Sequence, residues 1–97
     1  MRDKIIEIQY QTCNLCYALL RNINDNFINV SFDFVDHDSI VVKVVLSKRT
    51  DVEDGYIDDM SAEFTALQQR FDCVRKIQVE VGKHHVPLQN LVYHKAY

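Results

Sequence analysis

Three cysteines and four histidines are the residues of this 97-residue chain whose types suit metal binding or redox chemistry. Cys13 and Cys16 form a C-x-x-C pair, and His84 and His85 would complete a set of four zinc ligands. A structural zinc site normally holds its C-x-x-C pair in a tight turn, and a redox pair lies at a helix N-terminus. Both thiols instead fall mid-helix on the expected apolar stripe, where free cysteine packs as a small hydrophobic residue. We therefore expect no metal, no cofactor and no redox site.

An acidic segment dominates the charge distribution. Residues 51–63 contain no Lys or Arg, although the formal net charge of the chain is only −3. The carboxylates of this segment are Asp51, Glu53, Asp54, Asp58, Asp59 and Glu63. A calcium-binding EF-hand loop with Gly55 at its sixth position would begin at Thr50 and end at Ser61, and neither residue can replace the Asp and the bidentate Glu of that loop.

Two interpretations of the acidic segment remain. The acids are either a solvated helix N-terminus stabilised by the helix dipole, or a surface that attracts a basic protein. Two or three carboxylates satisfy a helix N-terminus, whereas six without a neighbouring base repel one another at some cost in stability. The density of charge therefore favours a surface for a protein partner.

Two further groups of residues could in principle do chemistry. His37 lies between two aspartates, but the spacing places no nucleophile, phosphate-binding loop or second histidine near it. The C-terminal region combines histidines and lysines with Tyr93 and Tyr97, residue types that also occur in RNA-binding surfaces. A sequence pI near 5.7 argues against binding through phosphate contacts. We expect neither an enzyme nor a nucleic-acid-binding protein.

Apolar residues at helical spacing predict two helices. The first falls within residues 3–26, and the Asn-rich residues 22–26 should end it. Its predicted inward stripe is Ile6, Cys13, Cys16, Tyr17, Leu20 and Ile23, widened by Ile5, Leu19 and Phe27. The second helix is indicated by Ile57, Met60, Phe64, Leu67 and Phe71. Thr50 and Glu53 have the spacing of a capping box, but Gly55 would weaken a helix already running, so we place the start near Asp54.

Alternating apolar residues predict the strands. Residues 30–35 and 40–46 should form an antiparallel hairpin through a turn at 36–39, and residues 74–81 and 88–94 should form two more strands. The predicted order is α-β-β-α-β-(β) in a single domain, residues 1–97. We expect an α+β two-layer sandwich, with two helices on an antiparallel sheet of three to four strands that has one wet side.

The length and composition indicate a cytoplasmic protein. No apolar run approaches the roughly 20 residues of a membrane helix, and the N-terminal residues do not have the layout of a secretory signal. An odd number of cysteines is consistent with a reducing compartment. We expect no membrane contact.

The chain resembles the immunity proteins that protect bacteria from their own toxins, as in contact-dependent growth inhibition and nuclease bacteriocin systems. The resemblance is one of style over the whole chain: a short α+β protein without a catalytic set, in which residues 53–64 form an acidic turn leading into an amphipathic helix. It implies a cytosolic antitoxin that binds a basic toxin domain one to one. The implied contact residues are Asp51, Glu53, Asp54, Tyr56, Asp58, Asp59 and Glu63, with Tyr56 as the aromatic anchor.

A second interpretation is a homodimerising structural or regulatory domain. In that case the last strand, residues 88–94, would lie at a sheet edge and pair with the same strand of a second copy. The acids would then only keep the surface soluble.

Overall fold

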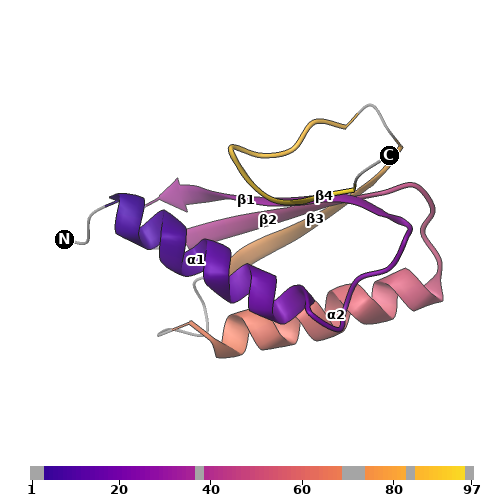
Figure 1. Cartoon of the computed structure of the whole chain (residues 1–97), viewed down its shortest axis with the longest axis horizontal. Coiled ribbons are helices and arrows are strands. Elements are labelled where there is room, and N and C mark those ends of the chain that lie inside the picture. Colours follow the sequence, from indigo (N-terminus) through magenta and orange to yellow (C-terminus); the bar gives the residue numbers. More distant parts are fainter. Residues whose placement is uncertain (1–3, 37–38, 69–73, 83–84, 96–97) are drawn as a thin grey trace.

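Within residues 4–36, 39–68, 74–82 and 85–95, which the computed structural model describes, one four-stranded sheet carries two helices on a single face (Figure 1). The elements are α1 (Lys4–Leu19), β1 (Phe27–Asp36), β2 (Ser39–Leu46), α2 (Asp51–Ala66), β3 (Val74–Val81) and β4 (Asn90–His94). The α+β class and the element order predicted from the sequence are confirmed. His37, Phe71, His84 and Tyr97, which the sequence analysis singled out, lie outside the described residues.

The strands are arranged in the order β3-β2-β1-β4. β1 and β2 form the predicted antiparallel hairpin, in which Val30 lies opposite Val44 and Phe32 lies opposite Val42. β4 pairs with the other side of β1, also antiparallel, and the register shifts between Val30 and Ser31. β3 and β4 are therefore the two edges of the sheet.

The sheet is mixed, so the prediction of a wholly antiparallel sheet is wrong. β2 and β3 run parallel, with Val42 beside Ile77 and Val44 beside Val79. α2 lies between these two strands in the chain, and a helix that runs back along the sheet returns the chain to the end at which β2 began. The residue pattern within a strand does not report its direction. Only the length of the helical connection between β2 and β3 indicates that the two strands run parallel.

The end of α1 agrees with the prediction, and the start of α2 does not. α1 ends at Leu19, just ahead of the Asn-rich residues 22–26, and the Asn22 side-chain amide donates to the Ala18 carbonyl at 2.8 Å. α2 begins at Asp51 rather than near Asp54, because Thr50 is its N-cap, with extended backbone angles of φ −130° and ψ 178°. The capping box therefore starts the helix even though a glycine follows in the second turn.

The face of α1 that packs on the core differs from most of the predicted stripe, of which only Leu19, Ile23 and Phe27 lie in or against the core. Its buried residues are Gln11, Leu15, Ala18 and Leu19. Tyr17 and Leu20, which were assigned to the inward stripe, are 62% and 72% exposed. The polar Gln11 can face inward because its amide exchanges hydrogen bonds of 2.7 and 2.8 Å with the amide of Gln68, just beyond α2.

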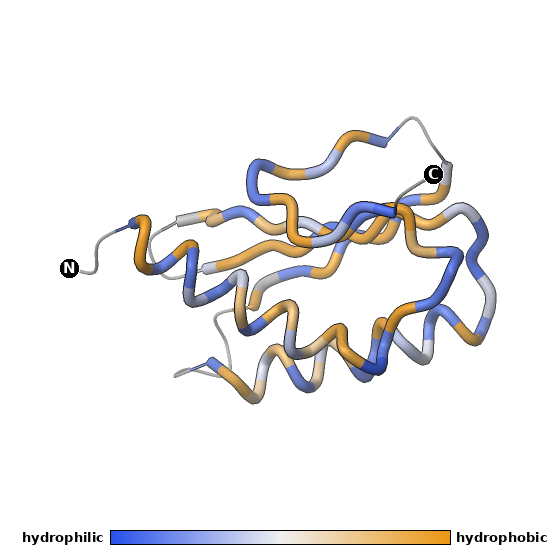
Figure 2. The backbone as a smooth tube through the Cα atoms, in the orientation of Figure 1, coloured by the Kyte–Doolittle hydropathy of each residue, from blue (hydrophilic) through white to orange (hydrophobic). Residues whose placement is uncertain are grey.

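The main core lies between the helices and the sheet. Apolar residues run along β1 and β2; in Figure 2 the hydrophobic colour predominates in both strands and is interrupted by polar residues, more often in β1. Its fully buried residues include Leu15, Phe32, Val42, Val44, Met60 and Phe64. The alternation in β1 and β2 and the three- and four-residue steps of α2 thus direct these side chains to one shared layer.

The opposite face of the sheet is partly covered, contrary to the expected wet side. Residues 85–89 cross this face before β4 begins (Figure 1). The Lys43 Nζ atom donates to the Val86 carbonyl at 2.7 Å, and the Leu88 amide donates to the Ser31 hydroxyl at 2.8 Å. Ser31, expected in solvent, is fully buried as a result.

Candidate functional site

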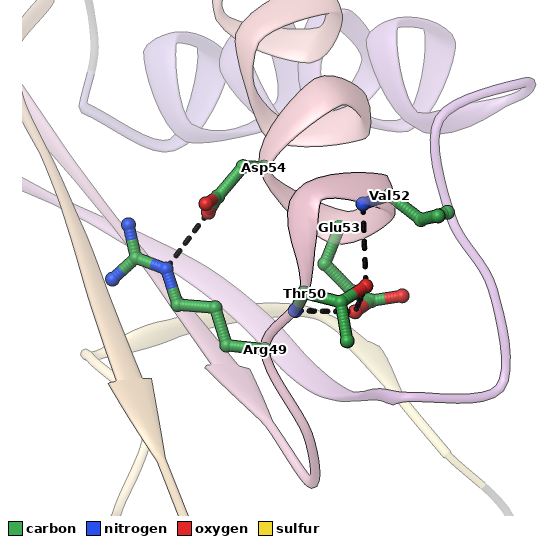
Figure 3. Close-up of polar contacts among 5 residues, drawn as sticks. All are labelled: Arg49, Thr50, Val52, Glu53 and Asp54. Carbon is green, nitrogen blue, oxygen red and sulfur yellow. Dashed lines mark hydrogen bonds and ion pairs between the residues drawn. The ribbon is translucent and has the colours of Figure 1, made fainter.

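The N-terminus of α2 is built by a reciprocal capping box (Figure 3). The Val52 amide donates to the Thr50 hydroxyl at 3.2 Å. In return, Glu53 Oε1 accepts from the Thr50 amide at 2.8 Å and from the Thr50 hydroxyl at 2.6 Å. These bonds satisfy backbone donors that a helix N-terminus otherwise leaves without partners.

Glu53 also joins α2 to the turn between α1 and β1. Its Oε2 atom accepts from the side-chain amides of Asn24 at 2.8 Å and Asn26 at 3.2 Å. The hydrogen bond from the Thr50 side chain, followed by that from Asn24, lowers the pKa of Glu53 from 4.5 to about 2, against the opposing effect of burial. Glu53 is therefore a carboxylate held ionised inside the protein.

Glu53 does not belong to an accessible binding surface, contrary to the sequence-based expectation. Only 1% of the residue is exposed, and both carboxylate oxygens accept hydrogen bonds within the chain. The signal for this role was present in the sequence as the Thr50-x-x-Glu53 spacing. The carboxylate is a structural part of the helix start.

The remaining acids of α2 lie outside the core. Asp51, Asp58, Asp59 and Glu63 are exposed, and Asp54 is partly exposed. In the sequence, these acids alternate with the buried Ile57, Met60 and Phe64. The helical period directs the acids to the exposed side of α2 and the apolar residues to the core side. We call Asp51, Asp54, Asp58, Asp59 and Glu63 the acidic α2 face. The helix Asp51–Ala66 itself contains no basic residue.

Two acids of this face have partners at its borders. Arg49 Nε lies 2.7 Å from Asp54 Oδ1, and both side chains are nearly half exposed (Figure 3). Glu63 Oε2 accepts a hydrogen bond of 3.2 Å from the side-chain amide of Asn22. Arg49 therefore neutralises one border of the acidic α2 face in part, while the centre keeps its negative charge.

Small residues separate the acids on the exposed side of α2. Gly55 and Ala62 are both exposed and lie one heptad apart, as Asp51 and Asp58 do. A Cβ atom placed on Gly55 would meet nothing within 4 Å. A partner can therefore approach this part of the helix closely and still reach the carboxylates.

Tyr56 is not a freely exposed aromatic anchor. It is partly buried and packs against the core cluster, with its ring 6.5 Å from that of Phe27 in an edge arrangement. Only the exposed part of its side chain is accessible to a partner. Asp59 follows three residues later, so the two positions are neighbours on the surface of α2.

The cysteine pair is exposed on α1, so the expectation that it packs into the core is wrong. Partial burial, and secondly the nearby Cys13, raise the pKa of the Cys16 thiol above 9.0. A raised pKa reduces the thiolate form that metal binding and redox exchange need. No group of three or more His, Cys, Asp or Glu residues suited to hold a metal occurs among the described residues.

A second surface was missed by the sequence analysis. The side of α1 that points away from the core carries apolar, thiol, amide and phenol groups and no charged group over most of its length. We call this surface, formed by Ile5, Ile6, Gln9, Cys13, Cys16, Tyr17 and Leu20, the outer α1 face. Its apolar period was visible in the sequence, but that period was assigned to the core.

Comparison with models of known protein families finds no match, and comparison with curated proteins finds no significant relative. The fold and the two surfaces are therefore the basis for a functional proposal. Among the described residues, no helix has both the length and the apolar character needed to cross a membrane.

Proposed function

We propose that this chain is a bacterial immunity protein, an antitoxin that binds a basic toxin domain in a one-to-one ratio through the acidic α2 face. The observation that carries the proposal is the exposed position of Asp51, Asp58 and Asp59 on a helix without a basic residue. The proposed place of action is the cytoplasm, where a producing cell needs protection. The toxin belongs to a contact-dependent growth-inhibition or nuclease bacteriocin system.

The chemistry of the face suits a nuclease toxin. A nuclease carries Lys and Arg because its substrate is anionic, and exposed carboxylates offer the same charge as phosphate groups. Electrostatic attraction would raise the rate of encounter, and desolvated pairs with the toxin's Arg residues would then slow dissociation. An inhibitor held in this way covers the groove or active site of the toxin.

Toxin binding at Asp54 would include one specific local step, the displacement of Arg49. In the free protein, Arg49 Nε lies 2.7 Å from Asp54 Oδ1. A guanidinium or ammonium group of the toxin that reaches Asp54 has to displace Arg49. The ion pair between Arg49 and Asp54 is exposed and hence weak. The contact with Arg49 therefore positions the Asp54 carboxylate, and breaking this contact costs toxin binding little free energy.

The alternative of a homodimer through the last strand receives mixed support. β4 does lie at an edge of the sheet. It has only five residues, Asn90–His94, and its pairing with β1 is irregular between Val30 and Ser31. Short and irregular edges are poor templates for pairing with another chain. We therefore favour the acidic α2 face as the functional surface.

The test is the rate of association with the product of the gene immediately upstream in the native host, measured at several salt concentrations. We expect a complex that suppresses toxin activity at a one-to-one ratio and forms more slowly as salt rises. Reversal of charge in Asp58→Lys combined with Asp59→Lys should slow association about tenfold or more at low salt. Both side chains are exposed, so the fold should be retained.

A matched control is the single reversal Glu80→Lys, compared with Asp58→Lys alone. Glu80 lies on β3 beside Val45, on the sheet face opposite the helices, and the two variants change the net charge equally. Asp58→Lys should slow association more than Glu80→Lys does. Equal effects of the two variants, or no complex at low salt, would overturn the proposed binding face.

A further inference from the structure

The outer α1 face is an unusually large apolar surface for a small protein. Ile5, Ile6, Tyr17 and Leu20 are 66%, 59%, 62% and 72% exposed. Cys13 and Cys16 between them are also exposed. Exposed apolar side chains that gather on one helix face mark interaction surfaces when they cover on the order of several hundred Å².

Four residues of this face are arranged symmetrically about Cys13. Ile6 and Leu20 each lie seven residues from it, and Gln9 and Tyr17 each lie four residues from it. Seven-residue steps combined with three- and four-residue steps are the spacing of helix pairs that pack side by side. The helical turn extends to the last of these positions, because the Leu20 amide donates to the Tyr17 carbonyl at 3.2 Å.

We propose that the outer α1 face is the contact surface between two copies of this chain, which pack as an antiparallel pair of α1 helices centred on Cys13. When two copies are related by a two-fold axis through Cys13, positions equally spaced on either side of Cys13 meet across the contact. In this arrangement Ile6 meets Leu20 of the second copy, and Cys13 meets its own counterpart. The dimer is independent of the proposed antitoxin activity.

Charge favours the antiparallel orientation. Between Lys4 and Arg21, α1 has one charged residue, Glu7, which lies toward the core side and accepts a hydrogen bond of 3.1 Å from Gln11. No charge therefore interrupts the outer α1 face. An antiparallel pair separates the two copies of Arg21 and brings each to the same end as Glu7 and Lys4 of the other copy, whereas a parallel pair places the two Arg21 side chains together.

The available area indicates a weak dimer. Stable interfaces bury roughly 800 Å² on each partner, and weaker ones bury less than about 600 Å². The outer α1 face falls near the lower class, and we expect a dissociation constant in roughly the micromolar range. β3 and β4 remain free of the contact because they lie in the sheet, on the other side of the helix layer (Figure 1).

Sedimentation equilibrium over a concentration series tests the proposal. We expect a reversible dimer for the natural sequence and at least about tenfold weaker association for Ile6→Lys alone or Leu20→Glu alone. Combined in one chain, the two substitutions should restore much of the association, because opposite charges then face each other across the two-fold axis. Within one chain these positions are too far apart along α1 to pair, at roughly 1.5 Å per residue.

Val86→Lys is the matched control, because Val86 is 71% exposed but lies outside α1. It should leave the association unchanged. A chain that remains monomeric at protein concentrations far above the micromolar range overturns the proposal. A dimer whose dissociation constant is unchanged by the α1 substitutions overturns it as well. Failure of the double variant to recover overturns the antiparallel arrangement.

Cross-linking provides an independent readout. With Cys73→Ser in both variants, oxidation should link two copies through Cys13 when Cys16→Ser is present, and much less through Cys16 when Cys13→Ser is present. In the antiparallel pair, Cys13 meets its own counterpart and Cys16 does not. Equal linking through both cysteines would indicate a parallel pair and overturn the proposed arrangement.

Discussion

At the scale of single residues, Glu53 shows how a carboxylate that looks like part of a binding surface serves the fold. It accepts hydrogen bonds from Thr50, Asn24 and Asn26, and thereby fixes the start of α2 against the turn that precedes β1. Its ionised form is favoured by those donors. The charge of Glu53 is thus used inside the protein, whereas the charges of Asp58 and Asp59 remain available in solvent.

The ionised state of Glu53 predicts a loss of stability in acid. Its pKa is lower in the folded chain, so the folded state binds fewer protons and the stabilisation is fully present above pH 4.5. That stabilisation is lost as the pH falls from 4.5 to about 2. Glu53→Gln should be less stable at neutral pH and should lack this part of the pH dependence, as measured by urea unfolding at several pH values. Asp59→Asn is the control and should keep the dependence of the natural sequence.

The capping box predicts a clear hierarchy for substitutions of Thr50. Thr50→Ala removes the hydroxyl that bonds to Val52 and Glu53 and should cost about 1 kcal/mol of unfolding free energy. Thr50→Ser keeps a hydroxyl and should retain most of the stability. Denaturant unfolding measures both. Equal losses for the two variants would show that the cap hydrogen bonds are not the source of the effect.

At the scale of elements, the two helices differ in how well their sequences predict them. The core side of α2 was predictable because Ile57, Met60 and Phe64 form one apolar stripe opposite charged residues. α1 has apolar residues on both sides, and its buried side includes Gln11, whose burial depends on the partner amide of Gln68. Periodicity cannot reveal such a distant partner, so the more apolar side was assigned to the core.

The binding surface was predictable only in part for the same reason. The exposed positions of Asp58 and Asp59 follow from the helical period. The removal of Glu53 from the surface depends on Asn24 and Asn26, which approach it only once the chain has folded. The parallel pairing of β2 and β3 likewise depends on the path of the chain rather than on the pattern of either strand.

Gly55 offers a direct test of the helical element. It lies within α2, is exposed, and has open space where a Cβ would be. Gly55→Ala should therefore raise the free energy of unfolding by roughly 0.5–1 kcal/mol. Gly82→Ala should lower it, because Gly82 has φ 122° in a region that favours glycine. Thermal and denaturant unfolding should show the two opposite signs; a loss of stability in Gly55→Ala would contradict the open position of this residue.

At the scale of the whole molecule, one helix layer presents two surfaces of opposite chemistry. The acidic α2 face suits a basic partner, and the outer α1 face suits an apolar one. The two helices pack together, with the Tyr10 hydroxyl donating to the Leu67 carbonyl at 3.1 Å. If both surfaces act, two copies joined through α1 would each hold one toxin domain. The complex would then contain two copies of each protein and still have a one-to-one ratio.

The two surfaces should respond to salt in opposite directions. Salt screens the attraction between carboxylates and a basic partner, so association through the acidic α2 face should slow as salt rises. Self-association through the uncharged outer α1 face should hold or strengthen, because salt also screens repulsion between two chains of net charge −3. Sedimentation of the chain alone and of the complex at low and high salt measures both. A dimer that dissociates in high salt would contradict the apolar character of the contact.

The strand order also determines when the chain can finish folding during translation. β4 is the last of the described strands, and its pairing partner is β1, the first of them. While the ribosome still holds β4, the hairpin β1–β2 and the helices can form, but one side of β1 has no neighbouring strand. The adjoining residues 85–89, which cross the outer sheet face, cannot be fixed there until β4 pairs with β1. A newly made copy therefore completes the sheet only once β4 has left the ribosome, and until then β1 depends on its other contacts for protection from aggregation.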